Sequence, residues 1–73
     1  MGSDLSYLIT ILYQTEIVRV ALRINRSQVS EDVFQYPMEP ENREILHGFL
    51  PEHVRSMGPI VAVEELFNVT VFG

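Results

Sequence analysis

The chain has 73 residues, a formal net charge of −5 and no cysteine. A chain of this length forms one domain, here residues 1–73, with a core too small to supply much stability. The absence of cysteine excludes disulfides, thiolate metal sites and cysteine nucleophiles. The acidic balance opposes general attraction to nucleic acid or anionic membranes. We therefore expect a protein partner or a second copy to supply part of the stability.

The first predicted elements lie in the apolar segment between residues 5 and 26. Its many β-branched and aromatic residues favour strands over helices. We expect two antiparallel strands, over about 5–14 and 16–26, after a flexible N-terminus at residues 1–4. The turn between them, Gln14-Thr15-Glu16, has none of the residues typical of hairpin turns. One long helix, which would make the protein mainly α, therefore remains the alternative.

Three of the five basic residues lie within residues 16–26, EIVRVALRINR. On a strand, Arg19 and Arg23 share one face, and the opposite face is apolar, formed by Val18, Val20, Leu22 and Ile24. On a helix, these two arginines and Arg26 would form one stripe. A nucleic-acid surface would need further cations and stacking aromatic residues on the same face. We expect the arginines to be solvated or paired within the chain.

The middle of the chain predicts a loop followed by a helix. Residues 27–40 indicate a loop with one short helical turn capped by Ser30. After it, apolar residues recur at the spacing of an amphipathic helix from about 40 to 57. Gly48 and Pro51 interrupt this pattern, so a kink or two short helices are expected there.

The C-terminal segment, IVAVEELFNVTVFG, allows two interpretations. Its valines fit strands over 60–64 and 67–72, or a short helix from Pro59 through VEELF can precede a single strand NVTVF. The expected fold is therefore a small single-domain α+β protein. It has an antiparallel hairpin, one helix packed on the apolar face of the hairpin, and one or two C-terminal strands.

Residues that could carry chemistry are few. The sequence has no nucleophile elbow, no phosphate-binding glycine loop and no dinucleotide fingerprint. Glu44 and His47 have the i,i+3 spacing of carboxylate metal sites, but a second such pair is missing. Seventy-three residues are also too few to enclose a substrate without a wall from a partner. We therefore expect no enzyme, no metal and no cofactor.

Contact with another chain is indicated by the hydrophobic fraction of 47%, which is more than a small core hides. The contact surface is predicted on the outer face of the hairpin, formed by Tyr7, Ile9, Ile11 and Tyr13. A second candidate is the loop at residues 34–38, where three apolar side chains are flanked by carboxylates. These side chains are Phe34, Tyr36 and Met38. The alternative is that the two aromatic residues cover the sheet as a lid.

The function predicted from these features is a small non-catalytic protein–protein interaction module. It would be a regulatory or accessory subunit, homo-oligomeric and cytoplasmic, because no signal peptide or apolar span is present. One alternative is a subunit whose catalytic or anionic small-molecule site forms only between protomers. Its anion ligands would be Arg19, Arg23, His47 and His53. Another alternative, an acidic inhibitor, would need carboxylates clustered on one face, whereas here they are scattered.

Overall fold

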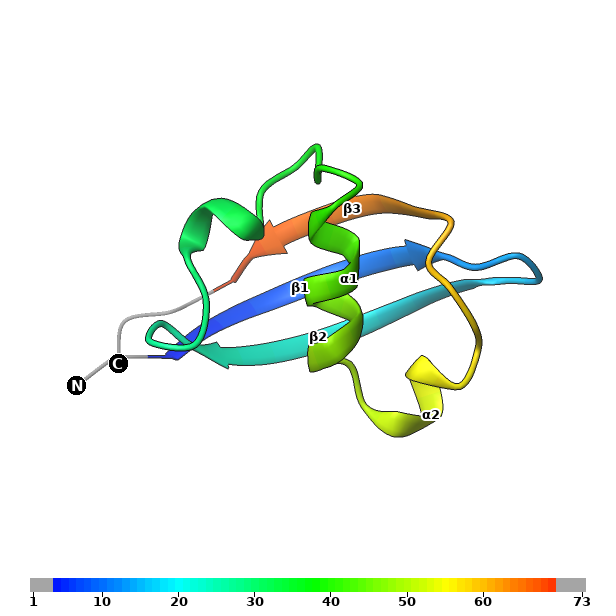
Figure 1. The fold of residues 1–73 in the computed structure, drawn as a ribbon, viewed down its shortest axis with the longest axis horizontal. Coiled ribbons are helices and arrows are strands. Elements are labelled where there is room, and N and C mark those ends of the chain that lie inside the picture. The colour runs from blue at the N-terminus through cyan, green and yellow to red at the C-terminus, as the bar shows by residue number, and fades with distance from the viewer. Residues whose placement is uncertain (1–3, 70–73) are drawn as a thin grey trace.

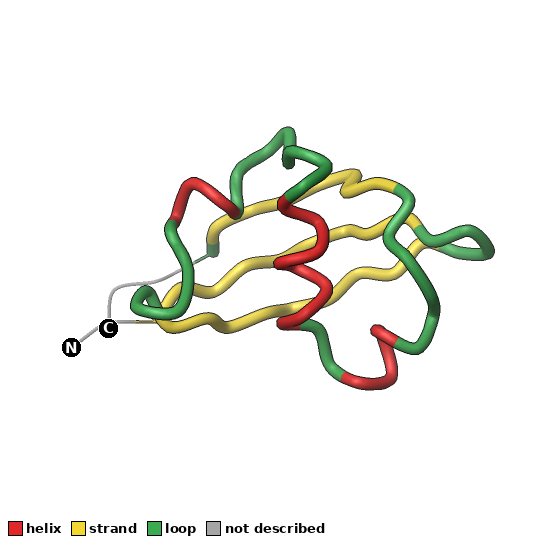
Figure 2. The backbone as a smooth tube through the Cα atoms, viewed as in Figure 1, coloured by secondary structure: helices red, strands yellow, loops and turns green. Residues whose placement is uncertain are grey.

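The computed structural model describes residues 4–69, with the backbone alone described at Glu31. The elements, in chain order, are strands β1 (Asp4–Leu12) and β2 (Ile17–Asn25), the 3-10 turn η1 (Glu31–Val33), helices α1 (Asn42–Phe49) and α2 (Glu52–Arg55), and strand β3 (Ala62–Asn68). The strands form one antiparallel sheet in the order β2-β1-β3. Helix α1 crosses one face of this sheet (Figures 1 and 2). The predicted α+β class is confirmed.

The N-terminal segment forms the predicted hairpin, and the alternative of one long helix is wrong. Strands β1 and β2 pair continuously from Asp4 opposite Asn25 to Leu12 opposite Ile17. At the turn, the Tyr13 N–H donates a hydrogen bond to the Glu16 carbonyl over 2.8 Å. Pairing along nine residues of each strand outweighs the poor turn sequence, because many β-branched cross-strand pairs contribute to sheet stability.

The predicted loop and interrupted helix are also present. The Ser30 hydroxyl accepts a hydrogen bond from the Asp32 N–H over 3.3 Å at the start of η1. Leu50 separates α1 from α2, with extended backbone at φ −75° and ψ 149°. It precedes Pro51, and proline disfavours helical backbone in the residue before it. The prediction of a helix broken at this point into two short helices is therefore confirmed, with α1 beginning at Asn42.

The C-terminal segment contributes one strand to the sheet. VEELF belongs to β3, so the helical interpretation of residues 59–67 is wrong: pairing with β1 satisfies the backbone of these residues. The two strands expected at 60–64 and 67–72 are instead one continuous strand with a bulge, which inserts Glu64 as an extra residue. Residues 70–72 lie outside the described part of the chain. So do residues 1–3 of the expected flexible N-terminus, and Asp4 is already in β1.

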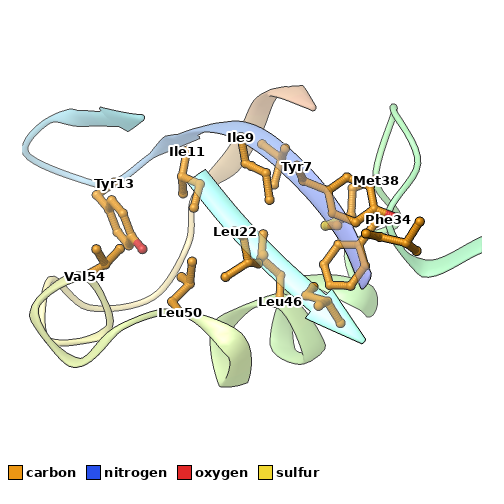
Figure 3. Close-up of a cluster of buried hydrophobic side chains, with 13 residues drawn as sticks. Tyr7, Ile9, Ile11, Tyr13, Leu22, Phe34, Met38, Leu46, Leu50 and Val54 are labelled. Carbon is orange, nitrogen blue, oxygen red and sulfur yellow. The ribbon is translucent and has the colours of Figure 1, made fainter. Parts of the chain in front are cut away.

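The hydrophobic core lies between the sheet and the two helices (Figure 3). Its floor is formed by alternate residues of β1 and by Tyr13 directly after the strand, each at most 2% exposed: Leu5, Tyr7, Ile9, Ile11 and Tyr13. Side chains of the helical segment cover them, namely Leu46, Leu50 and Val54. None of the helices in the described part of the chain is long and apolar enough to cross a membrane.

The predicted orientation of β1 is therefore wrong. Tyr7, Ile9, Ile11 and Tyr13 were expected on the outer face of the hairpin, but they face the helices. The reason is the strand register, because residues directly opposite each other share a face of the sheet. Tyr7 pairs with Leu22, and the helices that cover Leu22 must cover Tyr7 as well.

Candidate interaction surface

The face of the sheet that points away from α1 has no covering element among residues 4–69 (Figures 1 and 2). We call it the outer face. It is formed by the residues of each strand that alternate with the core residues. The register groups these residues into rows that each cross the three strands. Two of the rows are apolar and lie on either side of a polar row.

The rows are read from β2 through β1 to β3. The first apolar row is Ala21, Leu8 and Phe67; the polar row is Arg19, Thr10 and Glu65; the second apolar row is Ile17, Leu12 and Ala62. Ile17 is 60% exposed and Phe67 is 51% exposed, although both are large apolar side chains. The outer face therefore leaves apolar area in water that a partner would remove from it.

The two edges of the outer face carry opposite charges. Arg19 and Arg23 lie on β2, and both side chains are exposed. Glu65 lies on β3, where its Oε1 accepts a hydrogen bond from the Thr10 hydroxyl over 3.4 Å. This contact holds the carboxylate on the outer face, since Thr10 belongs to that face. No acidic side chain of the described residues forms an ion pair with Arg19.

A second feature is an open cleft of about 650 Å³ between α1 and the segment 58–60. Its basic side chains are Arg43, His47 and Arg55, and Glu44 also lines it. Arg55 is paired with Glu52 over 3.0 Å. The Arg43 Nε is shielded from solvent and has no hydrogen-bond partner among the described residues.

Comparison with protein-family models, with curated proteins and with solved structures finds no match to this chain. Its function must therefore be inferred from the outer face and the cleft. Within residues 4–69, no three side chains of His, Asp or Glu form a group that could hold a metal ion.

The residues expected to bind an anion do not come together in one chain. Arg19 and Arg23 lie on the outer face, whereas His47 and His53 lie on the helices that cover the opposite face. His47 is half-buried beside the cleft, and His53 is exposed on α2. Of this predicted set, only His47 lines the cleft, and Arg43 and Arg55 were missed.

The predicted docking loop is divided between core and surface. Phe34 and Met38 are 3% and 7% exposed, so their predicted place on a docking surface is wrong. The Phe34 ring packs between Tyr7 and Phe49, with ring centroids 5.2 Å and 6.1 Å away. Aromatic contacts of this kind favour burial of the ring over its exposure. Tyr36 alone of the three remains on the surface, at 59% exposed.

Sequence reasoning missed the residues that do form the outer face of β1 and β3, including Leu8, Leu12, Glu65 and Phe67. A signal for the two on β1 was present. The odd-numbered residues of β1 from Leu5 to Ile11 are all apolar or aromatic, whereas Ser6 and Thr10 interrupt the even-numbered ones, and this alternation favours the odd-numbered face as the core. For the two on β3 there was no comparable signal, because the bulge at Glu64 changes which residues face outward.

Proposed function

We propose that this chain is a small non-catalytic interaction module, a regulatory or accessory subunit, that self-associates through its outer face. The observation that carries the proposal is the uncovered pair of apolar rows, with Ile17 and Phe67 more than half exposed. Removing apolar area from water is the main driving force of protein association. The cytoplasmic location expected from the sequence stays a prediction.

A second copy is the occupant that the charges favour. The β2 edge of the outer face is cationic and the β3 edge is anionic, so the face can complement itself. A uniformly charged partner would meet repulsion at one of the two edges. Self-association satisfies both edges at once, and it also supplies the stability that a core of this size lacks.

The size of the outer face predicts a reversible dimer. Two strands of nine residues and one of seven lie side by side and cover at most roughly 30 Å by 14 Å, or a flat footprint of at most roughly 400 Å² per copy. Stable interfaces bury about 800 Å² per partner, and smaller ones are transient. We therefore expect the dimer to dissociate on dilution.

The proposal is tested by placing a charge on the outer face. Phe67→Glu and Ile17→Glu put carboxylates at positions already more than half exposed, so the monomer should fold normally. Each substitution should raise the dissociation constant by about tenfold or more, because a charge would be buried against apolar side chains. Analytical ultracentrifugation over a wide concentration range measures this constant.

Matched controls lie on the other side of the molecule. Tyr36 is 59% exposed in the loop before α1, and Ile45 is 40% exposed on α1. Tyr36→Glu and Ile45→Glu should leave the dissociation constant of the wild-type dimer unchanged. A wild-type chain that stays monomeric at every concentration would contradict self-association, and dissociation by the control variants alone would move the contact to the helical side.

A second candidate function is binding of a small anionic molecule in the cleft, favoured by the side chains of Arg43 and His47 that line it. One turn of α1 separates Arg43 from His47, so both face the cleft from the same side of the helix. A phosphate or carboxylate group would accept hydrogen bonds from the guanidinium with good geometry.

Inorganic phosphate tests this second candidate. A ligand that binds only the folded chain raises its melting temperature. Phosphate at millimolar concentration should raise the melting temperature of the wild type more than chloride of equal ionic strength does. Arg43→Gln should abolish the difference, while Arg23→Gln on the opposite side should retain it. Equal shifts in the two variants would mean that the cleft does not bind the anion.

A further inference from the structure

We infer that two copies pack outer face against outer face about a two-fold axis that runs along β1. This inference rests on the proposed self-association and adds its geometry. Packed sheets lie about 10 Å apart with their strands aligned to within about 30°. A two-fold axis along the central strand keeps every row at its own level and exchanges the two edge strands. Strand β2 of one copy then lies over β3 of the other.

Under this symmetry, the polar row of one copy faces the polar row of the other copy, and opposite charges lie over each other. Arg19 of one copy lies over Glu65 of the partner copy, and the same contact occurs again at the other edge. Thr10 lies next to the axis, where it already holds Glu65 in its own chain. The dimer therefore contains two ion pairs, one at each edge of the middle row, with an apolar row above and below them that reduces their contact with water.

The apolar rows match in size as well as in polarity. In the first row, the small Ala21 faces the large Phe67 of the partner copy. In the second row, the large Ile17 faces the small Ala62. Leu8 and Leu12 lie near the axis and meet their own counterparts. Large side chains opposite small ones fill the space between two sheets without voids or clashes.

Other symmetric arrangements lose these matches. A two-fold axis across the strands would place β2 over β2, so that Arg19 would face Arg19 and Glu65 would face Glu65. Like charges directly opposite each other oppose association. Pairing of two edge strands into one longer sheet would leave both apolar rows in water, and it would gain nothing from Phe67 or Leu8.

Charge reversal distinguishes the arrangements. In the proposed dimer, Arg19→Glu places two carboxylates together at each edge, and Glu65→Arg places two guanidinium groups together. Each single variant should raise the dissociation constant by about tenfold or more, and the double variant R19E/E65R should return it to near the wild-type value. With an axis across the strands, Arg19→Glu would replace a pair of facing guanidinium groups by a pair of facing carboxylates, and Glu65→Arg would do the reverse. The dissociation constant would then stay the same.

The net charge of the chain makes Glu65→Arg the more informative of the single variants. It lowers the net negative charge of a chain whose formal charge is −5, so general repulsion between copies decreases. Weaker association in spite of this decrease identifies a specific contact. Glu41→Arg, an exposed position next to α1, makes the same change of charge away from the outer face and should not weaken the dimer.

Mixing the two single variants completes the experiment. A chain with R19E and a chain with E65R should form a heterodimer in which both edges carry opposite charges, detected by native mass spectrometry. Failure of the double variant and of the mixture to restore association would overturn the proposed symmetry. If Phe67→Glu still dissociated the wild-type dimer in that case, self-association through the outer face would stand. A wild-type chain that forms no dimer would overturn both the proposed symmetry and the proposed self-association.

Discussion

Tyr13 combines a buried ring with an unsatisfied polar atom. The side chain is 1% exposed, and its hydroxyl has no hydrogen-bond partner among the described residues. Burial raises the pKa of Tyr13 above its ordinary value of 10, because the charged phenolate would lose its water. An unpaired buried hydroxyl costs about 1–3 kcal/mol of stability. The stability that Tyr13 contributes to the core therefore comes from its apolar ring and not from its hydroxyl group.

Tyr13→Phe should therefore raise the free energy of unfolding by about 1 kcal/mol at pH 7. The wild type should also lose stability as the pH rises above 10, because the unfolded state then releases the tyrosine proton before the folded state does. The Tyr13→Phe variant would lack this contribution, since phenylalanine has no proton to release. Urea unfolding at a series of pH values between 7 and 11 measures both effects. A less stable variant at pH 7 would mean that the hydroxyl has a partner after all.

At the scale of elements, the two glycines in and after the helices, Gly48 and Gly58, differ in backbone conformation. Gly48 lies inside α1, and a residue with less backbone freedom than glycine would make this helix more stable. Gly58 follows α2 with φ +103°, a conformation that side chains disfavour. An added Cβ would meet no atom within 4 Å at either position, so steric contact does not enter the comparison. Only backbone conformation separates the two sites.

The alanine variants should consequently have opposite effects. Gly48→Ala should raise the free energy of unfolding by about 0.5–1 kcal/mol, since α1 keeps its geometry and the unfolded chain loses freedom. Gly58→Ala should lower it by about 1–2 kcal/mol through backbone strain. Thermal unfolding followed by circular dichroism ranks the two variants against the wild type. If both variants changed the free energy of unfolding in the same direction, the difference in backbone conformation between Gly48 and Gly58 would not explain their effects.

At the scale of the whole molecule, residues 4–69 cover the sheet on one side only. A domain with a core of this size is marginally stable alone, and burial of the second face would link folding to association. The helices complete the core on one side. In the proposed dimer, the uncovered rows on the other side would contact a second copy.

Association that stabilises the fold makes the melting temperature depend on concentration. We expect the melting temperature of the wild type to rise as its concentration increases from about 1 μM to about 1 mM, because mass action favours the folded dimer. Phe67→Glu should remove most of this dependence, and Tyr36→Glu should retain it. Differential scanning calorimetry measures the effect. A melting temperature independent of concentration in the wild type would show that folding and association are not linked.

Particular residues explain which parts of the fold were predictable. The break at Leu50-Pro51 and the short turn after Ser30 follow from local chemistry, and both are present. The hairpin followed from strand propensity in spite of its poor turn. VEELF has no decisive local preference, and pairing with β1 made it a strand. The identity of the cleft residues was not predictable, because Arg43 and Arg55 come together only when α1, α2 and segment 58–60 fold.

By itself, the sequence determined the α+β class, the hairpin and the broken helix, because these depend on propensity, periodicity and proline over a few residues. Only the tertiary structure decided which side of the sheet the helices cover. Alternation along β1 favoured the face of Tyr7 and Ile9, because Ser6 and Thr10 interrupt the face of Leu8 and Leu12, but it did not fix which faces of β2 and β3 join it. Long-range pairing between β1, β2 and β3 resolved this, since one register assigns all three strands to the same core.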